Sequence, residues 1–103
     1  MPTRLETLKE MVAKSPTDAF LRYGLANEYA NAGNLEQAVT EFQELLAANP
    51  NYAAGYYHGG RTLEKLGRLE DARAIYEKGI EVTSRTGDAH TRSELQAALD
   101  ILG

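Results

Sequence analysis

The sequence predicts an all-α protein of about six helices arranged as antiparallel pairs. Alanine, leucine and glutamate are abundant, and they favour helix, whereas the β-branched residues that favour strands are sparse. Apolar residues recur every three or four positions, which is the period of a helix with one buried face. The chain also aligns with itself at an offset of 34 residues, which indicates a repeat architecture.

The 34-residue offset pairs residues of the same kind along two successive segments. Identical pairs are Pro16 and Pro50, Ala19 and Ala53, Tyr23 and Tyr57, Gly33 and Gly67, Leu35 and Leu69, Glu36 and Glu70, and Ala38 and Ala72. Conservative pairs are Ala26 with Gly60, Phe42 with Tyr76, and Leu46 with Ile80. Because these pairs share one offset, we divide the chain into repeat one, at 19–52, and repeat two, at 53–86.

Repeat one divides into two helices. An apolar stripe of Leu21, Leu25, Tyr29 and Ala32 predicts the first helix over 18–32. Gly33 is expected to end it in the left-handed conformation. Asn34 is expected to cap the second helix, with Gln37 as its capping-box partner. Asn49-Pro50 stops that helix, because proline cannot continue its hydrogen bonds.

Repeat two follows the same plan. We expect one helix from about residue 52 to residue 66, ended by Gly67, and another from about Leu69 past Val82. The residues expected to face inward on the latter are Leu69, Ala72, Ile75, Tyr76 and Ile80. Gly55, Gly59 and Gly60 do not form a phosphate loop, because no strand precedes them, and we expect them to allow close helix packing.

The two ends of the chain are expected to flank the repeats as single helices. Residues 1–16 predict an N-terminal half-repeat, whose helix over 3–14 places Leu5, Leu8, Met11 and Val12 on one face. At the other end, Asp88 is expected to cap a helix within 88–103. Its inward stripe would be Leu95, Leu99 and Leu102, with a polar outer face that suits the end of a repeat array. Residues 1–103 would thus form a single domain.

These residues resemble the tetratricopeptide repeat family. The family pattern reads Leu25-Ala26, Tyr29, Gly33, Ala38, Phe42 and Pro50 in repeat one. In repeat two it reads Tyr56, Gly60, Leu63, Gly67, Ala72 and Tyr76, with Ser84 in place of the proline. The small residues of the pattern allow two helix backbones to approach closely. The resemblance implies a short right-handed α-solenoid that binds another polypeptide.

Composition excludes several kinds of chemistry. There is no cysteine, so disulfides and thiolate sites are absent. The only histidines are His58 and His90, and the spacing of His90 to Glu94 is a single weak pair. We therefore expect no catalytic residue, no metal site, no cofactor and no enzymatic activity.

Charge and hydropathy narrow the partners and the location. A net charge of −4 with scattered basic residues argues against nucleic-acid binding. No apolar run is long enough to span a membrane, and the first residues lack the apolar run of a signal peptide. We expect a cytoplasmic location, whether the chain is a whole protein or a piece of a longer one.

The resemblance implies that the first helices of the repeats line a concave groove. The residues expected to bind a partner there are Phe20, Tyr23, Asn27, Tyr57, His58, Arg61 and Lys65. Stacked Tyr23 and Tyr57 would offer flat apolar area, and Arg61 a hydrogen-bond donor. The alternative is that the two tyrosines only pack on each other. The carboxylate clamp of chaperone-tail-binding members is mostly lost, because Tyr23 stands in place of its first lysine and His58 in place of its second asparagine.

Two functions remain open at this point. The first is a non-enzymatic protein–protein interaction module that binds a peptide or protein segment in the groove. The second is a structural module that self-associates as a homodimer through its terminal helices.

Overall fold

The computed structural model describes residues 1–103 and contains six α-helices and no strand. The helices are α1 (Arg4–Lys14), α2 (Ala19–Asn31), α3 (Leu35–Ala48), α4 (Ala53–Lys65), α5 (Leu69–Thr86) and α6 (Ala89–Leu102). The predicted class, an all-α helical repeat solenoid, is confirmed. The division into repeats at 19–52 and 53–86 remains a prediction.

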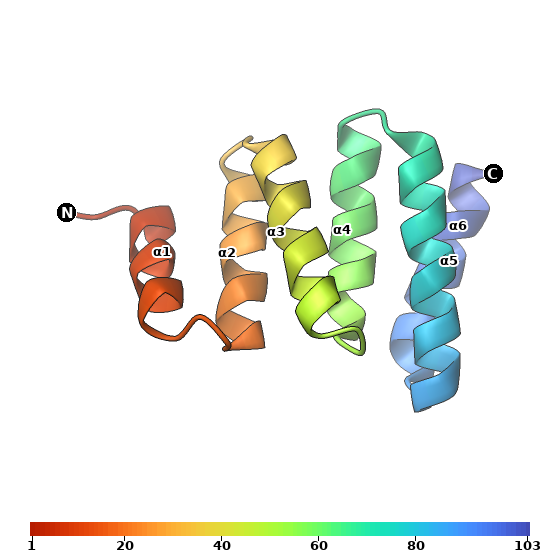
Figure 1. Cartoon of the computed structure of the whole chain (residues 1–103). Coiled ribbons are helices and arrows are strands. Elements are labelled where there is room, and N and C mark those ends of the chain that lie inside the picture. Colours follow the sequence, from red (N-terminus) through yellow and green to blue (C-terminus); the bar gives the residue numbers. More distant parts are fainter.

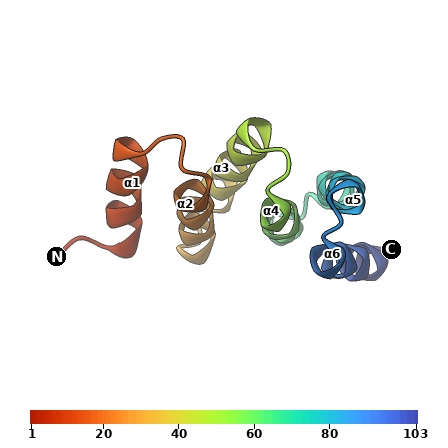
Figure 2. The same ribbon diagram turned by 90° about the horizontal axis from the view of Figure 1, so that it is seen from below.

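The helices stand side by side along an elongated molecule of 42 × 28 × 19 Å (Figure 1). Each helix packs against the next one in the chain, and α4 also contacts both α2 and α6. Figure 2 shows the resulting layers, with α2, α4 and α6 on one side and α3 and α5 on the other. The helix α1 contacts α2 alone, because it lies at the end of the row.

Two glycines in the left-handed region make the tight turns inside the helix pairs. Gly33 has φ 85° and Gly67 has φ 76°, as the sequence predicted. After Gly33, the N–H of Asn34 donates to the carbonyl of Tyr29 at 2.9 Å. The corresponding bond from Arg68 to Leu63 is also 2.9 Å. Both turns are Schellman motifs, which satisfy the last carbonyls of α2 and α4 and reverse the chain.

The predicted capping box at Asn34 is wrong, because its side chain makes no capping bond. The backbone N–H of Asn34 belongs to the Schellman turn, and its ψ is 66°. Asp88, whose N–H is likewise bonded five residues back and whose ψ is 80°, caps α6 as predicted by accepting from the N–H of Thr91 at 3.1 Å. Two further caps form near the N-terminus. Thr3 accepts from the N–H of Glu6, and Asp18 accepts from that of Leu21.

Two residues that were expected to face inward are exposed. Leu69 is 47% exposed, because it opens α5 directly after the turn, beyond the contact with α4. Met11 is 43% exposed, because α2 is the only helix that covers α1 and buries the stripe mainly at Val12. The stripe on α6 is as predicted at Leu95, which is fully buried.

Small residues bring the helices of each pair into close contact. Ala26, Ala38 and Ala72 are fully buried. A Cβ added to Gly60 would lie 2.2 Å from Cε1 of Tyr76, so α4 can approach α5 only with glycine there. The sequence analysis missed Gly79, where an added Cβ would lie 2.6 Å from the Cβ of Tyr56.

Gly60→Ala is expected to lower the free energy of unfolding by about 1–3 kcal/mol, because the ring of Tyr76 would have to move in a packed core. Gly24→Ala is the matched control on α2, since its Cβ would lie 3.5 Å from Leu8, an ordinary contact. Alanine there is expected to be neutral or to stabilise by up to about 1 kcal/mol. Urea unfolding of both variants measures the difference, and equal effects would contradict the packing argument.

Candidate functional site

The residues predicted to bind a partner lie on two neighbouring helices of the α2–α4–α6 layer. Phe20, Tyr23 and Asn27 are on α2, and Tyr57, His58, Arg61 and Lys65 are on α4. Their helical periodicity places them one or two turns apart on each helix. The contacts between them and with α6 decide which of them form a site.

Three predicted aromatic residues meet at the seam between α2 and α4. The ring of His58 lies 5.6 Å from that of Tyr23 and 5.2 Å from that of Tyr57, edge-on in both cases. The two tyrosines therefore do not stack on each other, contrary to the prediction, because the imidazole lies between them. Tyr52, with its ring 5.3 Å from that of Tyr23, extends the row. We call Tyr52, Tyr23, His58 and Tyr57 the aromatic cluster.

Arg61 continues this row and is held on two sides. Its Nη1 donates to the hydroxyl of Tyr57 at 3.1 Å, and its guanidinium lies 5.9 Å from the centre of that ring. Its Nε lies 3.8 Å from a carboxylate oxygen of Glu64. The hydrogen bond to Tyr57 is the main cause that raises the pKa of Arg61.

Glu64 is fixed in turn from the core. The hydroxyl of Tyr76, on α5, donates to its carboxylate, and the Tyr76 ring is fully buried. Burial, and then this hydrogen bond, raise the pKa of Tyr76 above its ordinary value. We call Arg61, Glu64 and Tyr76 the polar network. From the sequence, Tyr76 was expected only to pack inward and Glu64 was not predicted at all, although both differ in kind from their counterparts in repeat one, Phe42 and Ala30.

The other predicted residues are not joined to these groups by side-chain bonds. Phe20 is 71% exposed and projects from the first turn of α2. Lys65 is exposed and forms no ion pair, and Asn27 is half-buried without a side-chain hydrogen bond. They lie on the same two helices and border the cluster without contributing to its geometry.

The helix α6 adds residues that the sequence analysis missed. Ala98 and Ile101 border a small cavity of about 110 Å³ together with Arg61 and Glu64. Ile101 is 85% exposed. The sequence signal for Ile101 was that an apolar residue lies outside the inward-facing stripe of α6. The α2–α4–α6 face therefore carries the aromatic cluster, then the polar network, then an apolar edge.

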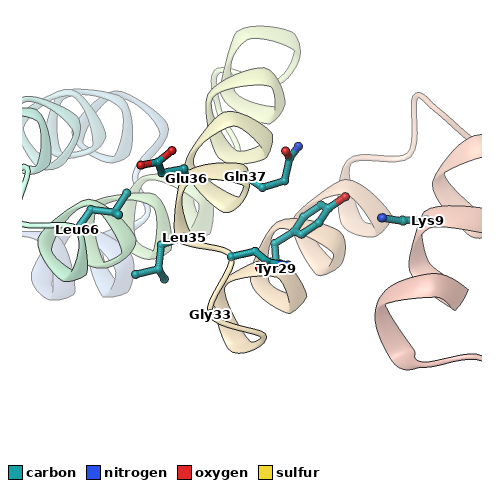
Figure 3. A pocket seen from close by; sticks show the side chains of 8 residues that line it. Lys9, Tyr29, Gly33, Leu35, Glu36, Gln37 and Leu66 are labelled. Carbon is teal, nitrogen blue, oxygen red and sulfur yellow. The ribbon is translucent and has the colours of Figure 1, made fainter.

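A larger cleft of about 590 Å³ lies elsewhere, at the turn between α2 and α3 (Figure 3). Lys9, Tyr29, Leu35 and Leu66 are among its lining residues, and the Nζ of Lys9 lies 5.5 Å from the centre of the Tyr29 ring. Figure 3 shows these side chains spread over an open surface rather than around one point. The cleft shares no residue with the predicted site.

No group of three or more histidine or acidic residues is placed to hold a metal ion. The pair noted in the sequence is present, since Nε2 of His90 lies 3.7 Å from Glu94, and both side chains are exposed. Two ligands of this kind do not complete a metal site.

Comparison with known proteins identifies the family. A family model described as tetratricopeptide repeat matches residues 23–89. This chain belongs to the tetratricopeptide repeat family. A tetratricopeptide repeat-containing protein of Pseudomonas aeruginosa is 33% identical over 95 residues, which cover 92% of this chain and 90% of the relative.

Solved structures agree with this assignment. A tetratricopeptide repeat domain protein from Salinibacter ruber is 40% identical, with a TM-score of 0.80 over 84% of this chain and 88% of that one. A protein from Bordetella parapertussis is 28% identical, with a TM-score of 0.85 over 99% and 89% of the two chains. Tetratricopeptide repeat domains generally bind protein partners and are typically scaffolds without enzymatic activity. None of the helices is long and apolar enough to cross a membrane.

His58 makes the stability of this tetratricopeptide repeat domain depend on pH. Burial lowers its pKa below the ordinary 6.5, Glu94 opposes that shift, and Arg61 and Lys65 add to it. The unfolded chain therefore binds a proton more readily than the folded one. Stability from neutral His58 is complete above about pH 6.5 and is lost as the pH falls from there toward the lower folded pKa.

We expect His58→Gln to flatten this part of the profile. Urea unfolding of both proteins between about pH 7.5 and pH 5 measures it. The difference in unfolding free energy between wild type and variant should shrink as the pH falls. A difference that stays constant over this range would show that the folded state does not disfavour the charged imidazole.

Proposed function

We propose that this chain is a non-enzymatic binding module that holds an extended segment of another polypeptide along the α2–α4–α6 face, in the groove expected for the family. The observation that carries the proposal is the continuous row formed by the aromatic cluster and Arg61. Tyrosine and arginine are the residue types that most often dominate binding energy in protein interfaces.

The geometry supports this role because the row is ordered before a partner arrives. Tyr23, His58 and Tyr57 hold one another through edge contacts, and Arg61 is hydrogen-bonded to Tyr57. Side chains that are already fixed lose little conformational entropy on binding. The exposed Phe20 and Ile101 border the row and offer apolar area at its two sides.

Self-association through the terminal helices has weaker support. The outer face of α6 is polar, and Gln96 donates to Asp100 across it at 2.9 Å. A polar outer face of this kind suits a terminal helix that remains in water. On α1 the exposed Met11 is the one apolar side chain that could contribute to such a contact.

The test uses peptides selected from a displayed library of random segments against the immobilised chain. The best binder is titrated into the ¹⁵N-labelled chain, and amide shifts are mapped by NMR. We expect shifts at Tyr23, Tyr57 and Arg61, and a loss of affinity of about tenfold or more in the Tyr23→Ala, Arg61→Ala double variant.

A matched control variant carries Gln43→Ala and Glu77→Ala, two exposed positions on the opposite layer. It is expected to bind as the wild type does. Peptides that shift only α3 and α5, or that bind the Tyr23 and Arg61 variant unchanged, would show that the α2–α4–α6 face is not the binding surface.

A further inference from the structure

The two repeats share a backbone plan but differ at one connected set of positions. Under the 34-residue offset, Arg61, Glu64 and Tyr76 correspond to Asn27, Ala30 and Phe42. Repeat two thus carries every member of the polar network, and repeat one carries none of them. Gly60 differs as well, since its counterpart is Ala26.

Gly60 gives the polar network its geometry. An added Cβ there would lie within 2.7 Å of three atoms of the Tyr76 ring, so the ring rests directly on the backbone of α4. From this position the Tyr76 hydroxyl reaches Glu64, one turn further along α4. Glu64 then orients Arg61 from one side while Tyr57 holds it from the other.

Arg61 still has donors to offer in this arrangement. A guanidinium carries five N–H donors, and Tyr57 and Glu64 engage only part of them. Lys65 lies four residues further along α4, and so on the same helix face, without an ion pair of its own. Two carboxylates match these two cations in number, Glu64 on α4 and Glu94 on α6, which acts on His58 together with them. Glu64 is engaged by Tyr76 and Arg61, and Glu94 lies 3.7 Å from His90. The hydrogen-bond donors left open on this part of the face belong to Arg61 and Lys65.

We propose that the polar network makes repeat two the acid-recognising half of the face, so that the bound segment carries an aspartate or glutamate beside Arg61 and Lys65. The same segment carries an aromatic or aliphatic side chain against Phe20 and Tyr23 on repeat one. This inference rests on the proposed function and adds the chemistry and direction of its ligand.

The spacing of the two ligand side chains follows from the layer. Neighbouring helices lie roughly 10 Å apart. Under the 34-residue offset, Arg61 also lies four residues further along its helix than Tyr23 and seven further than Phe20, or about 6–10 Å. The two positions are thus about 12–14 Å apart, so the acidic and apolar side chains of an extended segment should be about four residues apart. Tyr76 and Glu64 act as positioning residues in this scheme, because neither needs to touch the ligand.

The experiment begins with the same displayed library and asks which residues are enriched. We expect selected peptides to carry an acidic residue about four positions from an apolar one. The best peptide and its Glu→Gln or Asp→Asn counterpart are then titrated by calorimetry into the folded chain. The acidic peptide should bind about tenfold more tightly than its neutral counterpart.

The discriminating variant converts the network to its repeat-one counterpart, with Arg61→Asn, Glu64→Ala and Tyr76→Phe. It should keep only the weak preference, about twofold, that the exposed Lys65 supplies. Arg61→Gln alone, an exposed change that leaves the core intact, should do the same. Arg61→Gln with Lys65→Gln should bind both peptides alike. Tyr76→Phe alone should reduce the preference to about threefold, because Glu64 loses its anchor. Arg68→Gln, which removes another exposed arginine paired at i and i+3, is the control and should keep the full preference.

The outcomes separate the two proposals. Peptides that map to the α2–α4–α6 face but lack acidic residues would overturn the acid-recognition inference and leave the proposed function standing. A full preference that survives Arg61→Gln with Lys65→Gln would overturn it in the same way. If no selected peptide maps to that face, both proposals fail.

Discussion

At Gly60 the backbone of α4 lies against the ring of Tyr76, and this contact links the fold to the candidate site. Because Gly60 has no side chain, α4 and α5 can pack closely. The same contact positions the Tyr76 ring so that its hydroxyl reaches Glu64. Because the Tyr76 ring is fully buried, it cannot shift without opening the core. A packing constraint on the buried side of α4 therefore fixes a charged side chain on its exposed side.

The polar network also resolves an electrostatic problem. Glu64 is half-buried beside a fully buried ring, and a carboxylate without partners would be costly there. The Tyr76 hydroxyl supplies a hydrogen bond from the core and Arg61 supplies a positive charge from the surface. Removing Glu64 would leave the hydroxyl of the buried Tyr76 without its partner. Arg61, about half exposed, would keep its hydrogen bond to Tyr57.

Most of the fold could be predicted from sequence because its determinants are local. Gly33 and Gly67 adopt the left-handed conformation that their place after an apolar stripe indicates, and the 34-residue offset relates the two helix pairs. The errors arose where neighbours decide the outcome. The Asn34 side chain makes no cap, whereas that of Asp88 does after a similar turn. For the site, Tyr23, His58 and Arg61 were found from helix periodicity. The order of these side chains along the face was not predicted, because it depends on side-chain rotamers. The bond between Tyr76 and Glu64 was not predicted either, because it joins two helices across twelve residues of sequence.

The difference between the repeats bears on how so small a solenoid could choose a partner. Two chemically identical units would offer a segment equal sites, and it could shift by one unit at little cost in free energy. Specificity is a difference between the free energies of such alternatives. Arg61 in one repeat and Asn27 in the other make the two sites unequal, because a shifted segment with a carboxylate would place it beside a neutral amide. The helix pairs stay alike while the substituted positions, including the fully buried Tyr76, distinguish one half of the face from the other.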